Sequence, residues 1–529
     1  MKKNLLAAIT LLAASMSAGA ATNITMTITR DSLQHITGFG AAAIGTLMCP
    51  LQDVEPIKLA YGPDSEIGFN IMRIEVSPNP TGNNPADSQW YDSPYDWHGF
   101  VNVVKEGRKR GSIIYACPWS PMPSLKTNKD ASGGNYPADS GKTPVRATLN
   151  DNGYRNFFRW LNNFTKYMKN QNAPVDIISL QNEPDWWVNY SGCLYEPQDL
   201  VKLVKQSAST FDPITSAADP SKPIKLMSGE PLGYRADYAQ AILSDPESRK
   251  YIEYLGGHIY GHTPFQYDDG RDGEMKKSAD IAKKYGVKEI WMTEHSYDPW
   301  KEKTMPTWEE QIGFAKEVNE VILAGGTAYV YWYLTQFWGF IGDGESGING
   351  NDVDGYNTKN KILPRGYVAS HFAKYLAGSD RLKNVTKTGT ATLKEKAGLQ
   401  RNVFTKGDSI FVIAINSSAA DINLTMTLPD AIEEGHIMTS VANNDLCKMS
   451  DLNVTVGAKK AVVAIKPKSI NTIILKRYDP TGVSEIKAEQ NTKNIVKGIF
   501  TLSGTPLNYD ESALPKGIYI INGNKVVKN

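Results

Sequence analysis

Short apolar runs alternate with amphipathic stretches through most of the chain. The runs contain few polar residues, which is typical of strands that are covered on both faces. Between them, apolar residues recur every three to four positions, as in residues 154–168 and 308–324, and this spacing predicts helices that pack on one face. The runs that the pattern marks as strands are residues 36–43, 71–77, 113–118, 177–181, 224–228, 257–261, 289–294 and 328–333.

Eight strand-then-helix units in succession imply an α/β fold with parallel strands. They fit a (β/α)8 TIM barrel, which we expect over residues 38–378. Alternation alone also fits a doubly wound open sheet, and that alternative stays open at this point.

After the barrel the pattern changes to short strands of alternating polarity without helices. This change predicts an antiparallel β-sandwich over residues 379–477, attached to the barrel as a side domain. Residues 21–37 contain a similar alternation before the first barrel strand. We therefore expect this N-terminal segment to add a strand to the β-sandwich.

Residues 1–20 have the pattern of a secretory signal peptide. Lys2 and Lys3 precede an apolar run that begins at Leu5, and Ala18-Gly19-Ala20 fits a cleavage site. No later run is long enough to cross a membrane as a helix. The sequence thus predicts an exported protein without a transmembrane segment.

Residues 478–529 form a separate tail. A turn-rich break is followed by a polar stretch, and then by alternating residues that turn at Asn522-Gly523, as in a β-hairpin. The run from Leu514 to Gly523 resembles the C-terminal sorting domains of the type IX secretion system. This resemblance implies a protein secreted by, or held at the surface of, a Gram-negative bacterium, whereas the hairpin signal alone would fit a further small β element.

Composition narrows the possible partners and cofactors. With 57 Lys and Arg against 56 Asp and Glu, the net charge is +1, which argues against a nucleic-acid binder. Gly38-Phe39-Gly40 opens a Gly-x-Gly-x-x-Ala fingerprint, but Cys49-Pro50 interrupts the helix that a dinucleotide site requires. The four cysteines are irregularly spaced and indicate no zinc site. We expect a monomer without metal or cofactor.

Two carboxylates follow apolar strands at the expected mouth of the barrel. Glu183 ends the fourth strand segment and Glu294 ends the seventh. A carboxylate in this place is costly to bury unless it is partnered or used. Because a pair of carboxyl groups that flank one bond is what glycoside hydrolysis needs, the pair predicts a glycosidase.

Neighbouring residues fit the same chemistry. Asn182 can donate to a sugar hydroxyl, and Tyr260, after the sixth strand, can donate to Glu294. Arg73, on the second strand, can stabilise Glu294 by its charge, or it can form an internal ion pair with Glu75; the sequence leaves both open. The abundance of Tyr (26) and Trp (11) suits sugar stacking.

The motifs as a set resemble family 30 of the glycoside hydrolases, and most closely its bacterial xylanase branch. They are Gly38-Phe39-Gly40, the loop of residues 117–128, Leu180-Gln181-Asn182-Glu183-Pro184 and Trp291-Met292-Thr293-Glu294-His295. The resemblance implies that Glu183 is the acid/base and Glu294 the nucleophile of a retaining reaction, with carboxyl groups about 5–5.5 Å apart. Trp119, Trp332 and Trp338 are further candidates for lining the substrate cleft, although each could also be a core aromatic residue.

One stretch departs from the family pattern. Glucuronoxylan-specific members carry an Arg-Arg pair after strand eight, whereas here the stretch reads Tyr333-Leu334-Thr335-Gln336-Phe337-Trp338-Gly339. We therefore expect a β-linked polysaccharide substrate, foremost β-1,4-xylan, without need for a glucuronate branch. The alternatives are β-glucosidase, β-1,6-glucanase or exo-xylanase activity, and a non-catalytic glycan-binding protein of the cell surface.

Overall fold

The computed structural model describes most of the chain, in two compact units that divide after Tyr478. The described residues are 21–44, 51, 53–78, 97–135, 145–296, 306–335, 339–344, 358–386, 389–390, 398–442, 445–478, 498–502, 504–508, 510–522 and 524–528. The predicted signal peptide lies outside them and stays a prediction. None of the described helices has the length and apolar character to cross a bilayer.

Parallel strands close into a barrel in the first unit, which confirms the TIM-barrel prediction and excludes the open sheet. Each strand pairs with the next one along the chain, and β11 closes the ring against β2. The strands are β2 (Gly38–Ala42), β3 (Ile71–Glu75), β4 (Ile113–Cys117), β7 (Ile177–Ser179), β8 (Lys225–Met227), β9 (Ile252–His258), β10 (Glu289–Glu294) and β11 (Ala328–Tyr333).

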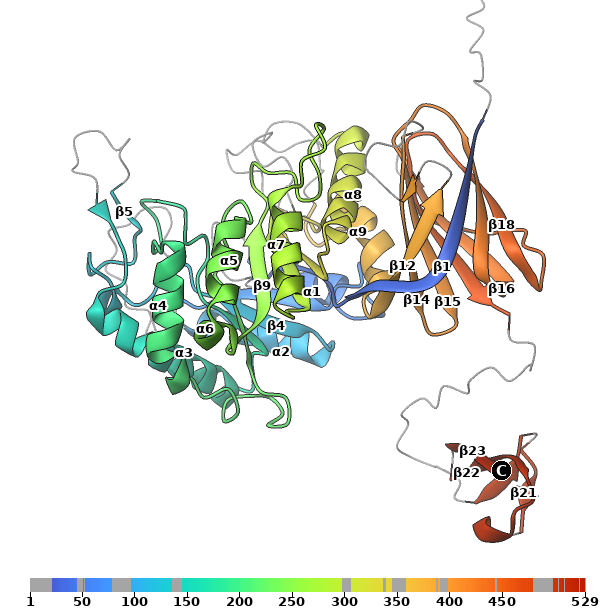
Figure 1. Ribbon diagram of the computed structural model, residues 1–529, viewed down its shortest axis with the longest axis horizontal. Helices are drawn as coiled ribbons and strands as arrows, with labels where there is room; N and C mark the ends of the chain where they lie inside the picture. Colours follow the sequence, from blue (N-terminus) through green and yellow to red (C-terminus); the bar gives the residue numbers. More distant parts are fainter. Residues whose placement is uncertain are drawn as a thin grey trace, which may run out of the picture. The chain divides into compact units, whose positions relative to one another are not determined.

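Helices surround these strands (Figure 1). Capping residues set where they begin: the Asn150 side chain accepts from the backbone N–H of Gly153, and Thr307 forms a capping box with Glu310. The helices are α1 (Glu55–Ala60), α2 (Val101–Lys109), α3 (Asp151–Asn170), α4 (Pro197–Ser207), α5 (Ala236–Ser244), α6 (Pro246–Arg249), α7 (Glu274–Lys284), α8 (Trp308–Leu323) and α9 (Pro364–Leu376). Short 3-10 turns lie at Trp97–Phe100, Pro123–Leu125 and Ala208–Thr210, and β5 (Gly134–Asn135) pairs with β6 (Val145–Arg146).

The sixth barrel strand starts earlier than the sequence predicts. We expected residues 257–261, but β9 spans Ile252–His258 and Tyr260 lies beyond it. Glu253 faces outward in its first half, where Lys225 pairs with it, so no continuous apolar run marks this part. Gly256 and Gly257 are required there, because an added Cβ would lie 2.6 Å from Met227 Sδ and from the Tyr234 ring.

The sheet-rich part of the first unit has its own apolar core, which includes Met26, Val403, Ile410, Leu424 and Val463. Its strands run in the order β1-β12-β14-β15-β19-β16-β17, and β1 also pairs in parallel with β16. In Figure 1 the blue β1 runs among the orange strands. The strands are β1 (Thr22–Ile36), β12 (Ser379–Thr386), β13 (Gly389–Thr390), β14 (Leu399–Lys406), β15 (Ser409–Asn416), β16 (Ile422–Val441), β17 (Asp445–Asp451), β18 (Ala458–Ile465) and β19 (Ser469–Arg477).

The second unit is a small sheet in the order β21-β20-β22-β23. Asn522 has a φ of +50°, as the first residue of a tight hairpin turn requires. The elements are β20 (Ile499–Thr501), β21 (Pro506–Leu507), a 3-10 turn at Glu511–Ala513, β22 (Gly517–Ile521) and β23 (Asn524–Lys528). A role of this unit in secretion stays a prediction.

Candidate active site

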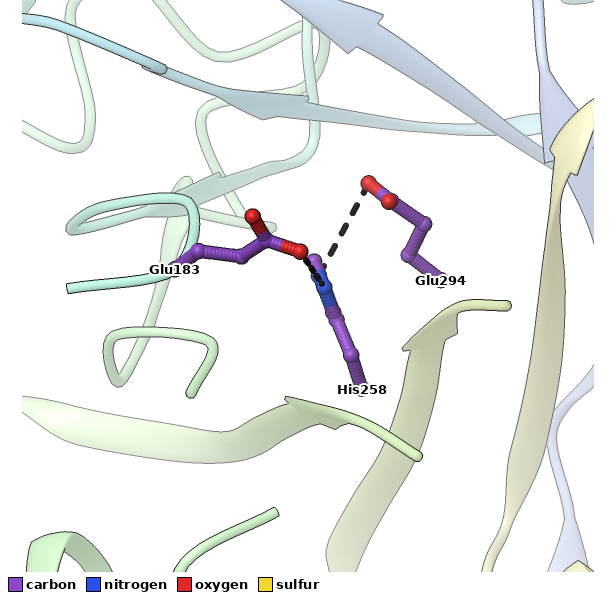
Figure 2. A group of neighbouring side chains, drawn as sticks. All are labelled: Glu183, His258 and Glu294. Atoms are coloured by element: carbon purple, nitrogen blue, oxygen red, sulfur yellow. Dashed lines mark hydrogen bonds and ion pairs between the residues drawn. The ribbon is translucent and has the colours of Figure 1, made fainter. Parts of the chain in front are cut away.

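The two predicted carboxylates meet at the carboxyl ends of the barrel strands. Glu294 is the last residue of β10, and Glu183 lies four positions beyond the end of β7. One oxygen from each carboxylate and one nitrogen of His258 lie within 4.8 Å of one another. Figure 2 shows the His258 ring between the two glutamates, with an interaction to each. The barrel thus brings residues 111 positions apart in the sequence into one site.

The backbone of Glu183 is held in an unusual conformation. Its φ is +42°, in the left-handed region, which costs a residue other than glycine about 1 kcal/mol or more. Its N–H donates to the Glu230 carbonyl at 2.9 Å, and its own carbonyl accepts from Trp186 at 3.0 Å. These bonds anchor the bend from which the Glu183 side chain reaches the centre of the site.

Glu294 is held by two donors. Arg73, fully buried on β3, donates to Glu294 Oε2, and the Tyr260 hydroxyl donates to Oε1 at 3.2 Å. The structure therefore shows the contact with Glu294 that was one of the two alternatives for Arg73. A fixed cation and a hydroxyl donor both favour the ionised carboxylate.

Arg73 also organises the surroundings of the pair. Its Nη2 donates to Asn182 Oδ1 at 2.7 Å and to Glu230 Oε2 at 3.1 Å, and its Nε donates to the Tyr115 hydroxyl at 2.9 Å. Because the Asn182 oxygen faces Arg73, the amide NH2 group is the part of Asn182 that can donate to a ligand.

The predicted tryptophans differ in exposure. Trp119 is 3% exposed, and its ring lies 4.4 Å from the Arg73 guanidinium carbon, so it packs against that side chain. Trp332 packs against Trp119 with ring centroids 5.6 Å apart and is partly exposed. Trp332 therefore offers the surface on which a sugar ring could stack, while Trp338 lies outside the described residues.

In this site, neighbouring charges and burial shift the pKa values of the buried groups in opposite directions. Burial raises the pKa of Glu183, although its hydrogen bond from His258 lowers it. Burial alone would lower the pKa of His258, but the negative charge of Glu294 and hydrogen bonds to Glu183 and Glu230 raise it to about 9. Burial also works against the ionised form of Glu230, yet Arg73 and His258 hold the pKa of that carboxyl well below its usual range.

Three residues of this network were not predicted as site residues. Glu230 follows β8 directly after Ser228-Gly229, and a search for carboxylates behind every apolar strand would have found it. His258 ends β9, where a polar residue at a barrel strand end is a similar signal. Tyr115 lies in the middle of β4 and has no comparable mark in the sequence.

Glu183, His258 and Glu294 form a donor set that is close enough to hold a cation. The surrounding charges oppose that use. Arg73 already donates to Glu294 Oε2, and the raised pKa of His258 keeps a proton on the ring that a metal would have to displace. We therefore assign no metal to these residues.

Comparisons with known proteins show which proteins the chain resembles. No family model matches the chain. The chain is 25% identical over 476 residues to the glucuronoxylanase XynC of Bacillus subtilis. The aligned region covers 87% of this chain and 92% of that protein.

Two solved structures share its fold. A family 30 subfamily 8 xylanase from Clostridium acetobutylicum has a TM-score of 0.64 and 24% identity, over 85% of this chain and 99% of that one. A family 30 endoxylanase from Clostridium papyrosolvens C71 has a TM-score of 0.64 and 20% identity, over 86% of this chain and 100% of that one. In sequence and in fold, the chain is therefore similar to the xylanase-like glycoside hydrolases of family 30, and this likeness gives its enzyme class.

Proposed function

We propose that this protein is a retaining glycoside hydrolase that cleaves β-1,4-xylan by double displacement. The observation that carries the proposal is the pair of carboxylate oxygens, from Glu183 and Glu294, that lie within 4.8 Å of each other. Retaining glycosidases hold their carboxyl groups about 5–5.5 Å apart, whereas inverting ones leave about 6.5–9.5 Å for a water molecule. The spacing supports the retaining mechanism.

In the first step, protonated Glu183 donates its proton to the glycosidic oxygen as the bond to the anomeric carbon breaks. Ionised Glu294 attacks that carbon and forms a glycosyl ester, and the shortened sugar chain leaves as an alcohol. The raised pKa of Glu183 suits the acid. Arg73 and Tyr260 orient Glu294 for attack.

In the second step, Glu183 is a carboxylate and takes a proton from water. The resulting hydroxide equivalent attacks the anomeric carbon, the ester bond breaks, and Glu294 regains its charge. His258 Nδ1 lies 3.0 Å from Glu183 Oε1 and stabilises the ionised form that this step needs. The Asn182 amide can donate to the sugar 2-hydroxyl in both steps.

Xylan is the favoured substrate because the relative with matching length is a glucuronoxylanase. The absence of the Arg-Arg pair after β11 supports action without a glucuronate branch. Thr335, the one residue of positions 335–338 that the structure describes, is buried and neutral. We further propose that residues 1–20 direct export, as suits an enzyme with a polymeric substrate.

The test is reducing-sugar release from linear xylan, glucuronoxylan, β-1,6-glucan and β-1,4-glucan, with the first product followed by proton NMR. We expect the fastest release from xylan and the β-anomer as the first product. Release from β-1,6-glucan alone would refute the substrate, and an initial α-anomer would refute retention. Binding to glycans without release would favour the non-catalytic alternative.

A further inference from the structure

Glu230 lies at the centre of the buried network but has no place in the two steps above. It follows β8 and is fully buried. Its Oε2 accepts from Tyr115 at 2.5 Å and from Arg73 at 3.1 Å, and it lies 3.4 Å from His258 Nε2. Arg73 donates to Glu294, and His258 contacts Glu183. Glu230 is therefore one step removed from both reacting carboxylates.

We propose that Glu230 is a positioning residue, a permanently ionised carboxylate that keeps His258 protonated throughout the reaction. This inference rests on the proposed function, because it assigns a task within that reaction. The nearest alternative is a merely structural acceptor for Tyr115 and Arg73, which would need no charge.

Charge balance links the Glu230 anion to the proton on His258. Among the five groups that contact one another here, Arg73 and His258 are positive before the first step, Glu230 and Glu294 are negative, and Glu183 is neutral. After it, Glu294 is a neutral ester and Glu183 carries the negative charge. The sum is zero in both states if Glu230 is ionised and His258 protonated, and also if both are neutral, so the two charges must change together. The donors Arg73 and Tyr115 on Glu230 Oε2 favour the ionised pair. Since an uncompensated buried charge is costly, this balance lowers the energy of both states.

The position of His258 shows what its proton would do. Nδ1 faces Glu183 and Nε2 faces Glu230, with Glu294 Oε2 at 3.8 Å. A protonated ring donates on both sides at once, whereas a neutral ring must accept on one of them. Loss of the proton would therefore leave either Glu183 or Glu230 without the donor that His258 provides. The ionisable and charged groups around His258 and Glu230 are Arg73, Tyr115, Cys117, Glu183, Asp185, Tyr234, Tyr260 and Glu294.

One substitution at this site would remove the negative charge of residue 230 and change little else. The contacts of Glu230 with Tyr115, Arg73 and His258 all go to Oε2, and Oε1 makes no hydrogen bond to any described N–H or O–H group. The Cys117 thiol also donates to this carboxylate. In Glu230→Gln the amide oxygen can take the place of Oε2 and the amide NH2 that of Oε1. The contacts with Tyr115 and Arg73 can then persist without the negative charge.

The other end of the barrel offers a matched control. Glu289, at the start of β10, also receives its donors on Oε2, from Thr37 at 2.7 Å, Trp291 at 2.8 Å and Thr327 at 3.0 Å. Glu289→Gln removes one charge from a similar acceptor that lies far from the reacting groups. Glu230→Asp is the conservative counterpart, since it keeps the charge.

The experiment follows the His258 ring by NMR against pH in the full chain, with its signal identified by its loss in His258→Asn. The chain has seven histidines, so the spectrum is tractable. In the wild type we expect His258 to keep its proton beyond pH 8. In Glu230→Gln its proton affinity should fall at least tenfold, with no change in Glu289→Gln and partial recovery in Glu230→Asp.

Kinetics on an aryl xylobioside add a second readout. We expect Glu230→Gln to lower kcat at least tenfold with little change in KM, and to shift the pH profile, while Glu289→Gln matches the wild type. An unshifted His258 in folded Glu230→Gln would overturn the inference. If that variant does not fold, a wild-type His258 that titrates at or below pH 6.5 would overturn it. Because the titration needs no substrate, inactivity of the wild type on all glycans would refute the proposed function separately.

Discussion

Two buried histidines in the first unit differ in charge, since one is protonated and the other neutral. His258 and His371 are both fully buried. His258 lies among three carboxylates, and its pKa is raised to about 9. His371 faces two hydroxyl groups, Thr472 Oγ1 at 2.9 Å and Ser440 Oγ at 2.8 Å, and burial lowers its pKa to about 3. Equal burial therefore does not set the charge of a histidine; its partners do.

The two places differ in what they are built to do. His258 ends β9 at the mouth of the barrel, where charges have to move during a reaction. His371 belongs to α9 and hydrogen-bonds to residues of β16 and β19. Hydroxyl groups can either donate or accept, so they satisfy a neutral imidazole completely. The His258 site holds charged groups for a reaction, whereas the His371 site joins α9 to the sheet through hydrogen bonds of a neutral ring.

The largest effect on activity should come from removing the Glu294 carboxylate at the mouth of the barrel. Glu294→Ala should lower kcat by about 10⁴-fold or more, because the nucleophile is lost. Azide should restore turnover and give the α-glycosyl azide, since a small anion fits the vacated space. Product analysis by NMR is the measurement. A β-azide from this variant would mean that the roles of the two glutamates are reversed.

Glu183→Ala should have a smaller effect that depends on the leaving group. On xylan the loss should be about 10²–10⁴-fold, as expected for a general acid. On aryl glycosides with good leaving groups the first step needs no proton, so much more activity should remain. Added azide should give the β-product by attack on the glycosyl-enzyme. Equal losses on both kinds of substrate would contradict the assignment of Glu183 as the acid.

The contact between α9 and the sheet should respond to pH rather than to substrate. Because His371 has a lower pKa when folded than when unfolded, the unfolded chain binds more protons, and stability should fall as pH drops from about 6.5 toward about 3. Over this range the free energy of unfolding should fall by a few kcal/mol, at about 1.4 kcal/mol per pKa unit. His258 has the opposite sign: its contribution is present below pH 6.5 and is lost as pH rises through about 9.

Thermal unfolding against pH measures both contributions. His371→Gln should flatten the acid side of the Tm curve and cost about 1–3 kcal/mol at pH 7, because a hydroxyl partner loses its hydrogen bond. The alkaline side should keep its shape in this variant. A wild-type acid slope that persists in full would show that His371 is not its source.

The smallest effect concerns glucuronate. A charge-assisted Arg–carboxylate contact contributes about 1.5–3 kcal/mol, which corresponds to tenfold or more in kcat/KM. Without the arginine pair, enzymatic removal of glucuronate from xylan should change kcat/KM less than about tenfold. Linear xylo-oligosaccharides serve as the reference. A larger fall would mean that another cation contacts the glucuronate, such as Arg271, or Lys301, which lies outside the described residues.

The sequence predicted the structure best where a single local rule determines it. Every barrel strand was found, because strands covered on both faces must be apolar, and Glu183 and Glu294 were marked as polar residues that follow such strands. The first half of β9 was missed because Glu253 faces solvent and two glycines serve packing. The network around Glu230 could not be predicted, since it depends on which side chains of β3, β4, β8 and β9 converge. No local pattern distinguishes Tyr115 from any other core tyrosine.

The course of β1 has a consequence for the order in which the chain can assemble. This strand of 15 residues precedes the whole barrel, yet its partners β12 and β16 follow it. During synthesis β1 emerges before either partner exists, so one edge stays unpaired until β12 is complete at residue 386, and the other until the chain has grown beyond residue 427. Pairing between strands that lie far apart in the sequence slows folding, and an unpaired strand edge is prone to aggregation. A chaperone that shields β1 until the later strands arrive would therefore raise the yield of native protein more than one that acts on the barrel.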